Sequence, residues 1–147
     1  MASAAEMWAE FSAATGVVAE YEAFGFGNPN TPALRDELAV LVRQGVKTAT
    51  AGHPEEFAAA GEKVPQVGDY WVVVDSRGEA AAVIRTVEVT PTRFEDVDEQ
   101  FAWDEGEGDR TLAWWRTAHI EYFERAGVSI GPSTVLILER FERVWPL

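Results

Sequence analysis

The sequence predicts an α+β domain that contains a small β-barrel. Short hydrophobic segments typical of strands alternate with amphipathic helical segments, and hairpin-type turns join neighbouring strands in place of repeated strand–helix–strand units. The 147 residues, 47% of them hydrophobic, suffice for one core. No linker, repeat or low-complexity segment divides the chain. We therefore predict a single domain over residues 1–147, with an N-terminal helical extension over about 1–30.

The N-terminal segment predicts one helix and leaves the next residues open. Ser3 and Glu6 form a capping-box pattern, which starts a helix over about 4–15. Gly16 then ends the helix, because glycine adopts the left-handed conformation at little steric cost. Residues 17–21 fit either a strand or a second short helix.

A second amphipathic helix, over about 33–43, leads directly into a strand over about 48–51. Thr31 supplies the N-cap of this helix, and Gly45 ends it. Lys47 therefore lies at a helix-to-strand junction, a position where a cleft commonly opens. It is one of only two lysines in the chain, so it does not belong to a lysine-rich surface.

The middle of the chain predicts a short helix and a β-hairpin. The helix covers about 53–61. Two strands, 70–75 and 80–90, are joined by the turn 76–79. Pro91 is expected to end the second strand, because proline cannot donate a ladder hydrogen bond.

The C-terminal part predicts a long helix and a closing strand. Asp109 is a suitable N-cap for a helix over about 109–125, and residues 134–145 form the closing strand. The stretch 95–109 holds eight carboxylates and no basic residue. We expect most of these carboxylates to form a solvated acidic face. Their spacing lacks the pattern of a calcium loop, so we predict no metal site.

The overall charge limits the classes of partner. A net charge of −13 repels a long polyanion, so a pocket for a small ligand is favoured over an extended nucleic-acid track. The chain has no cysteine, which excludes disulfides and thiolate chemistry. No apolar run reaches membrane-spanning length and no secretory signal is recognisable, so we expect a cytoplasmic protein without membrane contacts.

The segment Gly45-x-Lys47-x-x-Thr50 resembles the GxKxxT signature of the ASCH-domain family, part of the PUA-like superfamily. The resemblance runs from about Phe24 to the C-terminus and is closest to the longer bacterial branch of the family. Three later features carry it further: Gly68-Asp69, the strand 83–89, and the stretch 101–109 followed by Thr111-Leu112-x-x-Trp115-Arg116-x-x-His119. This resemblance implies a PUA-like barrel flanked by helices.

The resemblance also implies an activity. Small ASCH proteins include amidohydrolases that deacylate N4-acetylcytidine with a lysine and a threonine of the signature and a downstream glutamate; longer members are described as ribonucleases. Lys47 and Thr50 match the first two roles, Glu105 is the best match to the third, and Glu107 is the fallback. The chain departs from small members after the signature, where it continues with Ala-Gly-His in place of a basic residue.

These matches imply an acyl-transfer mechanism. Thr50 would attack the amide carbonyl, and Lys47 would accept its proton or stabilise the oxyanion. A lysine that keeps a carboxylate partner stays charged and acts electrostatically. Glu105 would protonate the departing ring amine, which requires that burial among tryptophans raise its pKa. Without the family resemblance, the sequence would favour a solvated Lys47 just after a helix C-terminus, where the helix dipole stabilises a cation.

Further candidates would bind the substrate. Phe24 and Phe26 are predicted to stack on a base, or else to plug the core beneath a glycine turn, which is the commoner fate of such rings. Glu107, Arg116 and His119 are predicted to contact the ligand. Alternatively, Arg116 pairs with a local acid and His119 packs in the core.

The sequence therefore predicts a protein that binds a nucleoside-like ligand or a short single-stranded RNA, without a cofactor or metal. Hydrolysis of an N4-acylated cytidine is the preferred function. A metal-independent ribonuclease and a non-catalytic RNA- or nucleotide-binding module stay open as alternatives.

Overall fold

The computed structural model describes residues 2–147. The elements in chain order are α1 (Ala4–Thr15), β1 (Tyr21–Phe24), α2 (Pro32–Arg43), β2 (Ala49–Gly52), α3 (Pro54–Ala60), β3 (Tyr70–Val74), β4 (Ala80–Arg93), the 3-10 turn η1 (Phe94–Asp96), α4 (Glu99–Glu105), α5 (Leu112–Arg125) and β5 (Val135–Trp145). The predicted α+β class is confirmed. None of the helices within residues 2–147 is long and apolar enough to cross a membrane.

The five strands form one mixed sheet in the order β1-β3-β4-β5-β2. Strands β1 and β3 pair in parallel, and the remaining neighbours are antiparallel. No ladder joins β1 to β2 within residues 2–147, so a closed barrel is not shown.

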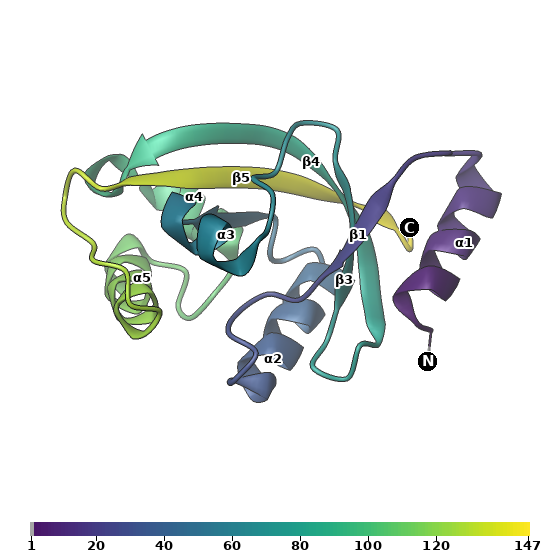
Figure 1. Ribbon diagram of the computed structural model, residues 1–147, viewed down its shortest axis with the longest axis horizontal. Helices are drawn as coiled ribbons and strands as arrows, with labels where there is room; N and C mark the ends of the chain where they lie inside the picture. Colours follow the sequence, from purple (N-terminus) through teal and green to yellow (C-terminus); the bar gives the residue numbers. More distant parts are fainter. Residues whose placement is uncertain (1) are drawn as a thin grey trace.

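Helices cover both faces of the sheet (Figure 1). Helix α2 packs on one face of β3 and β4 through a cluster that includes Leu38, Val42 and Ile84, and α1 packs on the opposite face through Met7 and Phe11. Helices α4 and α5 build a third cluster against β2 and β5. In Figure 1, α1 and α5 lie at opposite ends of the molecule, with the long strands β4 and β5 running between them.

Strand β4 is longer than the sequence predicts. Pro91 does not end it, since the strand continues to Arg93 and Pro91 lies opposite Ile137 of β5. Strand β3 pairs with the first part of β4, so within the described residues 2–147 Pro91 has a sheet neighbour on one side alone. The missing N–H of proline is tolerated there because no second ladder needs it.

Two further boundaries differ from the prediction. The predicted helical extension over about 1–30 contains α1 but also β1, which pairs in the sheet, so it is only partly helical. The N-cap of α5 is Thr111, and the carboxylate of Asp109 instead accepts hydrogen bonds from the backbone and hydroxyl of Thr111. A short Asx turn has taken the place of the predicted cap.

Candidate functional site

The end of α2 turns Lys47 into the protein. Gly45 adopts the left-handed conformation, with φ of 77°. The backbone N–H groups of Val46 and Lys47 then both donate to the carbonyl of Leu41, at 3.0 and 3.1 Å. This tight turn reverses the chain before β2 begins, and the Lys47 side chain is only 1% exposed. A solvated lysine behind a helix terminus is thereby excluded.

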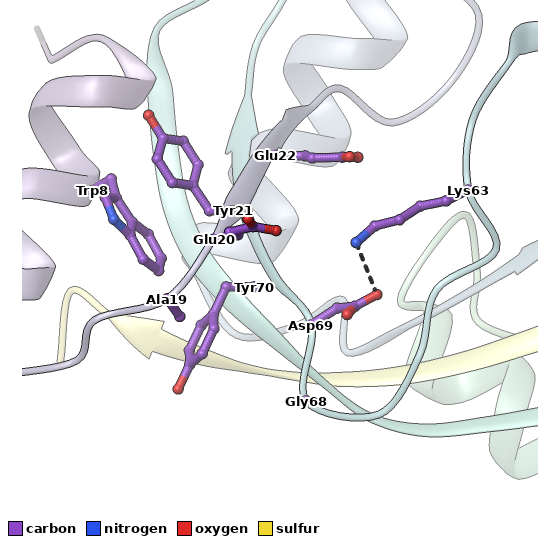
Figure 2. A pocket seen from close by; sticks show the side chains of 9 residues that line it. All are labelled: Trp8, Ala19, Glu20, Tyr21, Glu22, Lys63, Gly68, Asp69 and Tyr70. Carbon is purple, nitrogen blue, oxygen red and sulfur yellow. Dashed lines mark ion pairs between the residues drawn. The ribbon is translucent and has the colours of Figure 1, made fainter.

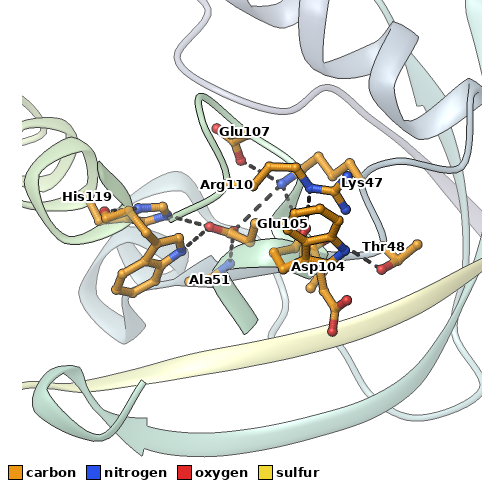
Figure 3. A network of polar contacts seen from close by, with 11 residues as sticks. Lys47, Thr48, Ala51, Asp104, Glu105, Glu107, Arg110 and His119 are labelled. Atoms are coloured by element: carbon orange, nitrogen blue, oxygen red, sulfur yellow. Dashed lines mark hydrogen bonds and ion pairs between the residues drawn. The ribbon is translucent and has the colours of Figure 1, made fainter. Parts of the chain in front are cut away.

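The Lys47 ammonium lies among acceptors (Figure 3). Its Nζ donates to Glu107 Oε2 at 2.8 Å and to the carbonyl of Ala49 at 2.9 Å, and it is 3.7 Å from Glu105 Oε1. The ring of Phe26 lies beneath it, 5.2 Å from Nζ to the ring centroid. A buried cation is tolerated at this position because two carboxylates and a carbonyl replace its water.

Glu105 is enclosed by donors. The backbone N–H of Ala51 donates to its Oε1 at 3.1 Å, while Trp115 Nε1 and His119 Nε2 both reach Oε2, the latter at 3.0 Å. His119 Nδ1 is 2.8 Å from the carbonyl of Trp115, so both ring nitrogens face acceptors and the imidazolium form satisfies both. The site is therefore a chain of alternating charges: His119, Glu105, Lys47 and Glu107.

The pKa shifts follow from these neighbours. Burial lowers the pKa of Lys47, but the charges of Glu107 and Glu105 outweigh it and raise the pKa above its usual value. Burial likewise lowers the pKa of His119, and the charge and hydrogen bond of Glu105 reverse this and raise it. Lys47 is therefore a cation at neutral pH, which excludes the free-amine role and leaves the electrostatic one.

Glu105 differs from the prediction. Burial raises its pKa, but the charges of His119 and Lys47, together with hydrogen bonds from His119 and Trp115, outweigh burial and lower the pKa below its usual value. The sequence-based expectation of a raised pKa was wrong, because the positive charges of His119 and Lys47 lie beside this carboxylate, and Trp115 adds a hydrogen bond in place of a purely apolar contact.

The acidic stretch supplies these carboxylates through a helix and a sharp turn. Asp98 caps α4 by accepting from the N–H of Phe101 at 2.8 Å. Gly106 ends α4 with φ of 73°, and a Cβ at this position would lie 2.7 Å from the carbonyl oxygen of Val46. Only glycine fits this close approach, which brings the residues on both sides of it to Lys47. Helix α4 is absent from the sequence-based prediction, although a glycine after a run of helix formers was the available signal.

Thr50 lies on β2, directly opposite Glu139 of β5. Its side chain is half-buried and makes no hydrogen bond with any residue in 2–147. Ala49 and Ala51, its neighbours on β2, face the cluster under α5, so Thr50 faces the other side of the sheet. Its hydroxyl is therefore free for a ligand on the α2 side.

The remaining predicted residues separate into two groups. Phe26 is 4% exposed and packs in the core cluster under α2, with Phe24 against it at a centroid distance of 4.9 Å. The burial of Phe26 and the partial burial of Phe24 agree with the interpretation as a core plug. Arg116 is exposed on α5 and makes no ion pair or hydrogen bond with residues 2–147, so the structure does not bring it to Lys47.

A second buried polar group was missed entirely. Glu139 of β5 is 8% exposed and accepts a hydrogen bond from the hydroxyl of Thr86 at 2.6 Å. Thr86 in turn accepts from Trp71 Nε1 at 3.0 Å. The alternating pattern of a strand marks such positions as inward-facing, but it does not say that a carboxyl will be buried there.

A surface pocket of about 610 Å³ lies elsewhere, beside β1 and β3 (Figure 2). Its lining consists of Trp8, Ala19, Glu20, Tyr21, Glu22, Lys63, Gly68, Asp69 and Tyr70. Lys63 pairs with Asp69 across it at 3.5 Å. None of the predicted site residues lines this pocket. Within residues 2–147, no three His, Asp or Glu side chains form a group that could hold a metal ion.

Comparisons with known proteins show which family and which folds the chain resembles. A family model described as ASCH domain matches residues 22–145. A crystal structure of an ASCH domain from Lactobacillus crispatus JV V101 is similar, with a TM-score of 0.83 and 27% identity over 96% of this chain and 93% of that chain. A protein from Enterococcus faecalis V583 has a TM-score of 0.78 and 26% identity over 94% of this chain and 85% of its own. No curated protein matches the chain.

Proposed function

The chain belongs to the ASCH domain family, and from this premise we propose that it hydrolyses the amide of N4-acylated cytidines at the site around Lys47. The observation that carries the proposal is the buried Lys47 cation, held between Glu105 and Glu107 and followed on β2 by the free hydroxyl of Thr50. Acyl transfer needs a nucleophile, a proton carrier and a charge that stabilises the oxyanion. These residue types supply all three.

The two carboxylates take different roles because their surroundings differ. The Glu105 side chain is 1% exposed and has a donor on each oxygen, so it orients Lys47 and His119. The Glu107 side chain is 17% exposed, and among the charged groups of residues 2–147 it pairs with Lys47 alone. A substrate can reach Glu107, which therefore carries the proton in this mechanism. This assignment moves the acid–base role from Glu105 to Glu107.

The reaction proceeds in two stages, formation of an acyl-Thr50 ester and its hydrolysis. Thr50 Oγ forms a bond to the acyl carbon while Glu107 takes the hydroxyl proton, and Lys47 stabilises the negative oxygen of the tetrahedral intermediate. The carbon–nitrogen bond then breaks, Glu107 returns the proton to the exocyclic nitrogen, and cytidine leaves. Water next attacks the acyl-Thr50 ester with Glu107 as base, which releases a carboxylic acid and restores the hydroxyl.

Release of cytidine from N4-acetylcytidine tests the proposal. Thr50→Ala should lower kcat/KM by ~10³-fold or more, and Glu107→Gln by ~10²–10⁴-fold. Thr90→Ala and Lys63→Met are the matched controls, since both residues are exposed and lie outside the charge chain. Activity that survives Thr50→Ala at the parental rate refutes the nucleophile, and a parent protein that releases no cytidine refutes the function.

The same preparation separates the alternatives. A ribonuclease would cleave a short single-stranded RNA and depend on Lys47 but not on Thr50. A binding module would retain the RNA intact, with an affinity that falls with salt. Either result, together with inactivity on N4-acetylcytidine, replaces the hydrolase proposal.

A further inference from the structure

A row of polar side chains crosses the sheet and ends beside Thr50. Trp71 of β3, Thr86 of β4 and Glu139 of β5 are joined by hydrogen bonds, and Thr50 of β2 is the direct cross-strand neighbour of Glu139. Directly opposite residues of an antiparallel pair share a face, with Cβ atoms about 5 Å apart. Because Phe141, two residues beyond Glu139, packs in the core cluster under α2, the row lies on the α2 side.

The hydrogen bonds of this row have a fixed direction. Trp71 Nε1 can only donate, so it uses the acceptor side of the Thr86 hydroxyl. The single proton of Thr86 must then go to Glu139 Oε2. The carboxyl therefore has Oε2 occupied as an acceptor, and Oε1 is the atom that carries a proton when the group is neutral.

Oε1 of Glu139 is free. It makes no hydrogen bond with residues 2–147, and it is not among the fully enclosed unpaired atoms of this part of the chain. Burial raises the pKa of Glu139 to about 7, with the Thr86 hydrogen bond and the charge of Lys47 opposing the rise and Asp69 adding to it. Asp69 is itself paired with Lys63. Near neutral pH the group is thus populated as a hydrogen-bond donor.

We propose, on the premise of the function above, that Glu139 is a further catalytic residue: its neutral carboxyl donates a hydrogen bond from Oε1 to ring nitrogen N3 of the acylated pyrimidine. N3 is a hydrogen-bond acceptor next to the carbon that bears the acylated nitrogen. When the amide bond breaks, negative charge spreads from the departing nitrogen to N3, and a donor at N3 stabilises that charge. The carboxyl keeps its proton throughout, so Glu107 is still the group that transfers protons in the reaction.

The geometry fits one substrate molecule. Thr50 must reach the acyl carbon on the exocyclic nitrogen, and Glu139 must reach the adjacent ring nitrogen. Two cross-strand neighbours on one face are separated by a distance suited to contact N3 of the ring with one side chain and the acyl carbon beside it with the other. The charge of Lys47 acts on Glu139, so the ammonium lies close enough to belong to the same site.

The first test measures kcat/KM for N4-acetylcytidine as a function of pH. The parent kcat/KM should fall about tenfold per pH unit above about 7, as Glu139 loses its proton. Glu139→Gln keeps an acceptor for Thr86 and places an N–H donor where Oε1 was. It should therefore stay within ~10-fold of the parent below pH 7, lose the falling limb, and exceed the parent at pH 9. Deprotonation of His119 would also produce a falling limb, but that limb would persist in Glu139→Gln and would overturn the inference.

The second test needs no hydrolysis and so separates the inference from its premise. Binding of cytidine is compared with binding of 3-deazacytidine, which has C–H in place of N3, at pH 6 by calorimetry. The parent and Glu139→Gln should prefer cytidine by about tenfold, and Glu139→Ala should show no preference. Equal affinity of the parent for the two nucleosides, or a preference that survives in Glu139→Ala, overturns the inference even if hydrolysis is found. A preference that depends on residue 139 in a protein without hydrolysis upholds the ring contact and refutes only the proposed reaction.

Discussion

Replacing Glu139 by glutamine should stabilise the protein at pH 8 and leave its stability nearly unchanged at pH 4.5. The Glu139 carboxyl is buried, and its pKa is raised from 4.5 to about 7. The folded protein therefore binds this proton more tightly than the unfolded chain does. A glutamine at the same position imitates the neutral carboxyl. Because it has no proton to lose, it does not destabilise the folded protein when the pH rises.

The sign and the magnitude of this change in unfolding free energy follow from the linkage between proton binding and folding. Below pH 4.5 the carboxyl is neutral in both states, so the stability that its proton confers is fully present. This stability is lost as the pH rises from 4.5 through about 7. At about 1.36 kcal/mol per pH unit, the interval corresponds to roughly 3 kcal/mol, an upper value because the site is not completely enclosed.

Urea unfolding of the parent and of Glu139→Gln between pH 4.5 and 8.5 measures this difference in unfolding free energy. The advantage of the variant should grow steadily and then level off above pH 8. Glu142→Gln on the same strand is the matched control, because the Glu142 side chain is 55% exposed and its removal relieves no burial. A difference between parent and Glu139→Gln that is constant across the pH range would refute the reasoning.

The other predictions concern the charge chain and its turn. Lys47→Met should cost about 3–5 kcal/mol of unfolding free energy, because it leaves two carboxylates without their buried cation, whereas Lys63→Met, at a 52% exposed side chain, should cost ~0.5 kcal/mol or less. The pKa of His119 should lie above its ordinary 6.5 in an NMR titration; the stability gained from its charged form is complete below 6.5 and is lost as the pH rises through the higher folded value. Gly106→Ala should cost ~1–3 kcal/mol more than Gly61→Ala in urea unfolding, because both glycines have positive φ but only a Cβ at position 106 meets a backbone carbonyl. Equal losses for the two variants would mean that this close approach does not constrain the turn.

Elements with a local signal were predicted well. The capping box of Ser3 and Glu6 is formed, and α1 covers the predicted 4–15. The amphipathic helix before Lys47 and the closing strand were predicted within about two residues of their observed bounds. In each case the pattern of capping residues and apolar spacing lies within a few residues of the element that it specifies.

Elements that depend on partners far away in the chain were not predicted well. Strand β1 is held by its parallel pairing with β3, almost fifty residues away in the chain (Tyr21 to Tyr70). Helix α4 reads as a solvated acidic segment, yet Phe101 and Ala102 are buried in it. The packing of this face on β2 and α5 cannot be deduced from the local acidic composition.

The sequence by itself determined the class of the fold, the position of Lys47 after a helix, and the set of residue types that acyl transfer would need. Tertiary structure decided which of these side chains are charged. Lys47 stays protonated because Glu107 and Glu105 lie beside it, and Glu105 stays ionised because His119 and Lys47 lie beside it, whereas burial with few compensating charges raises the pKa of Glu139 to about 7. The pKa of a buried group depends on which partners surround it in three dimensions, and that arrangement exists only once the chain has folded.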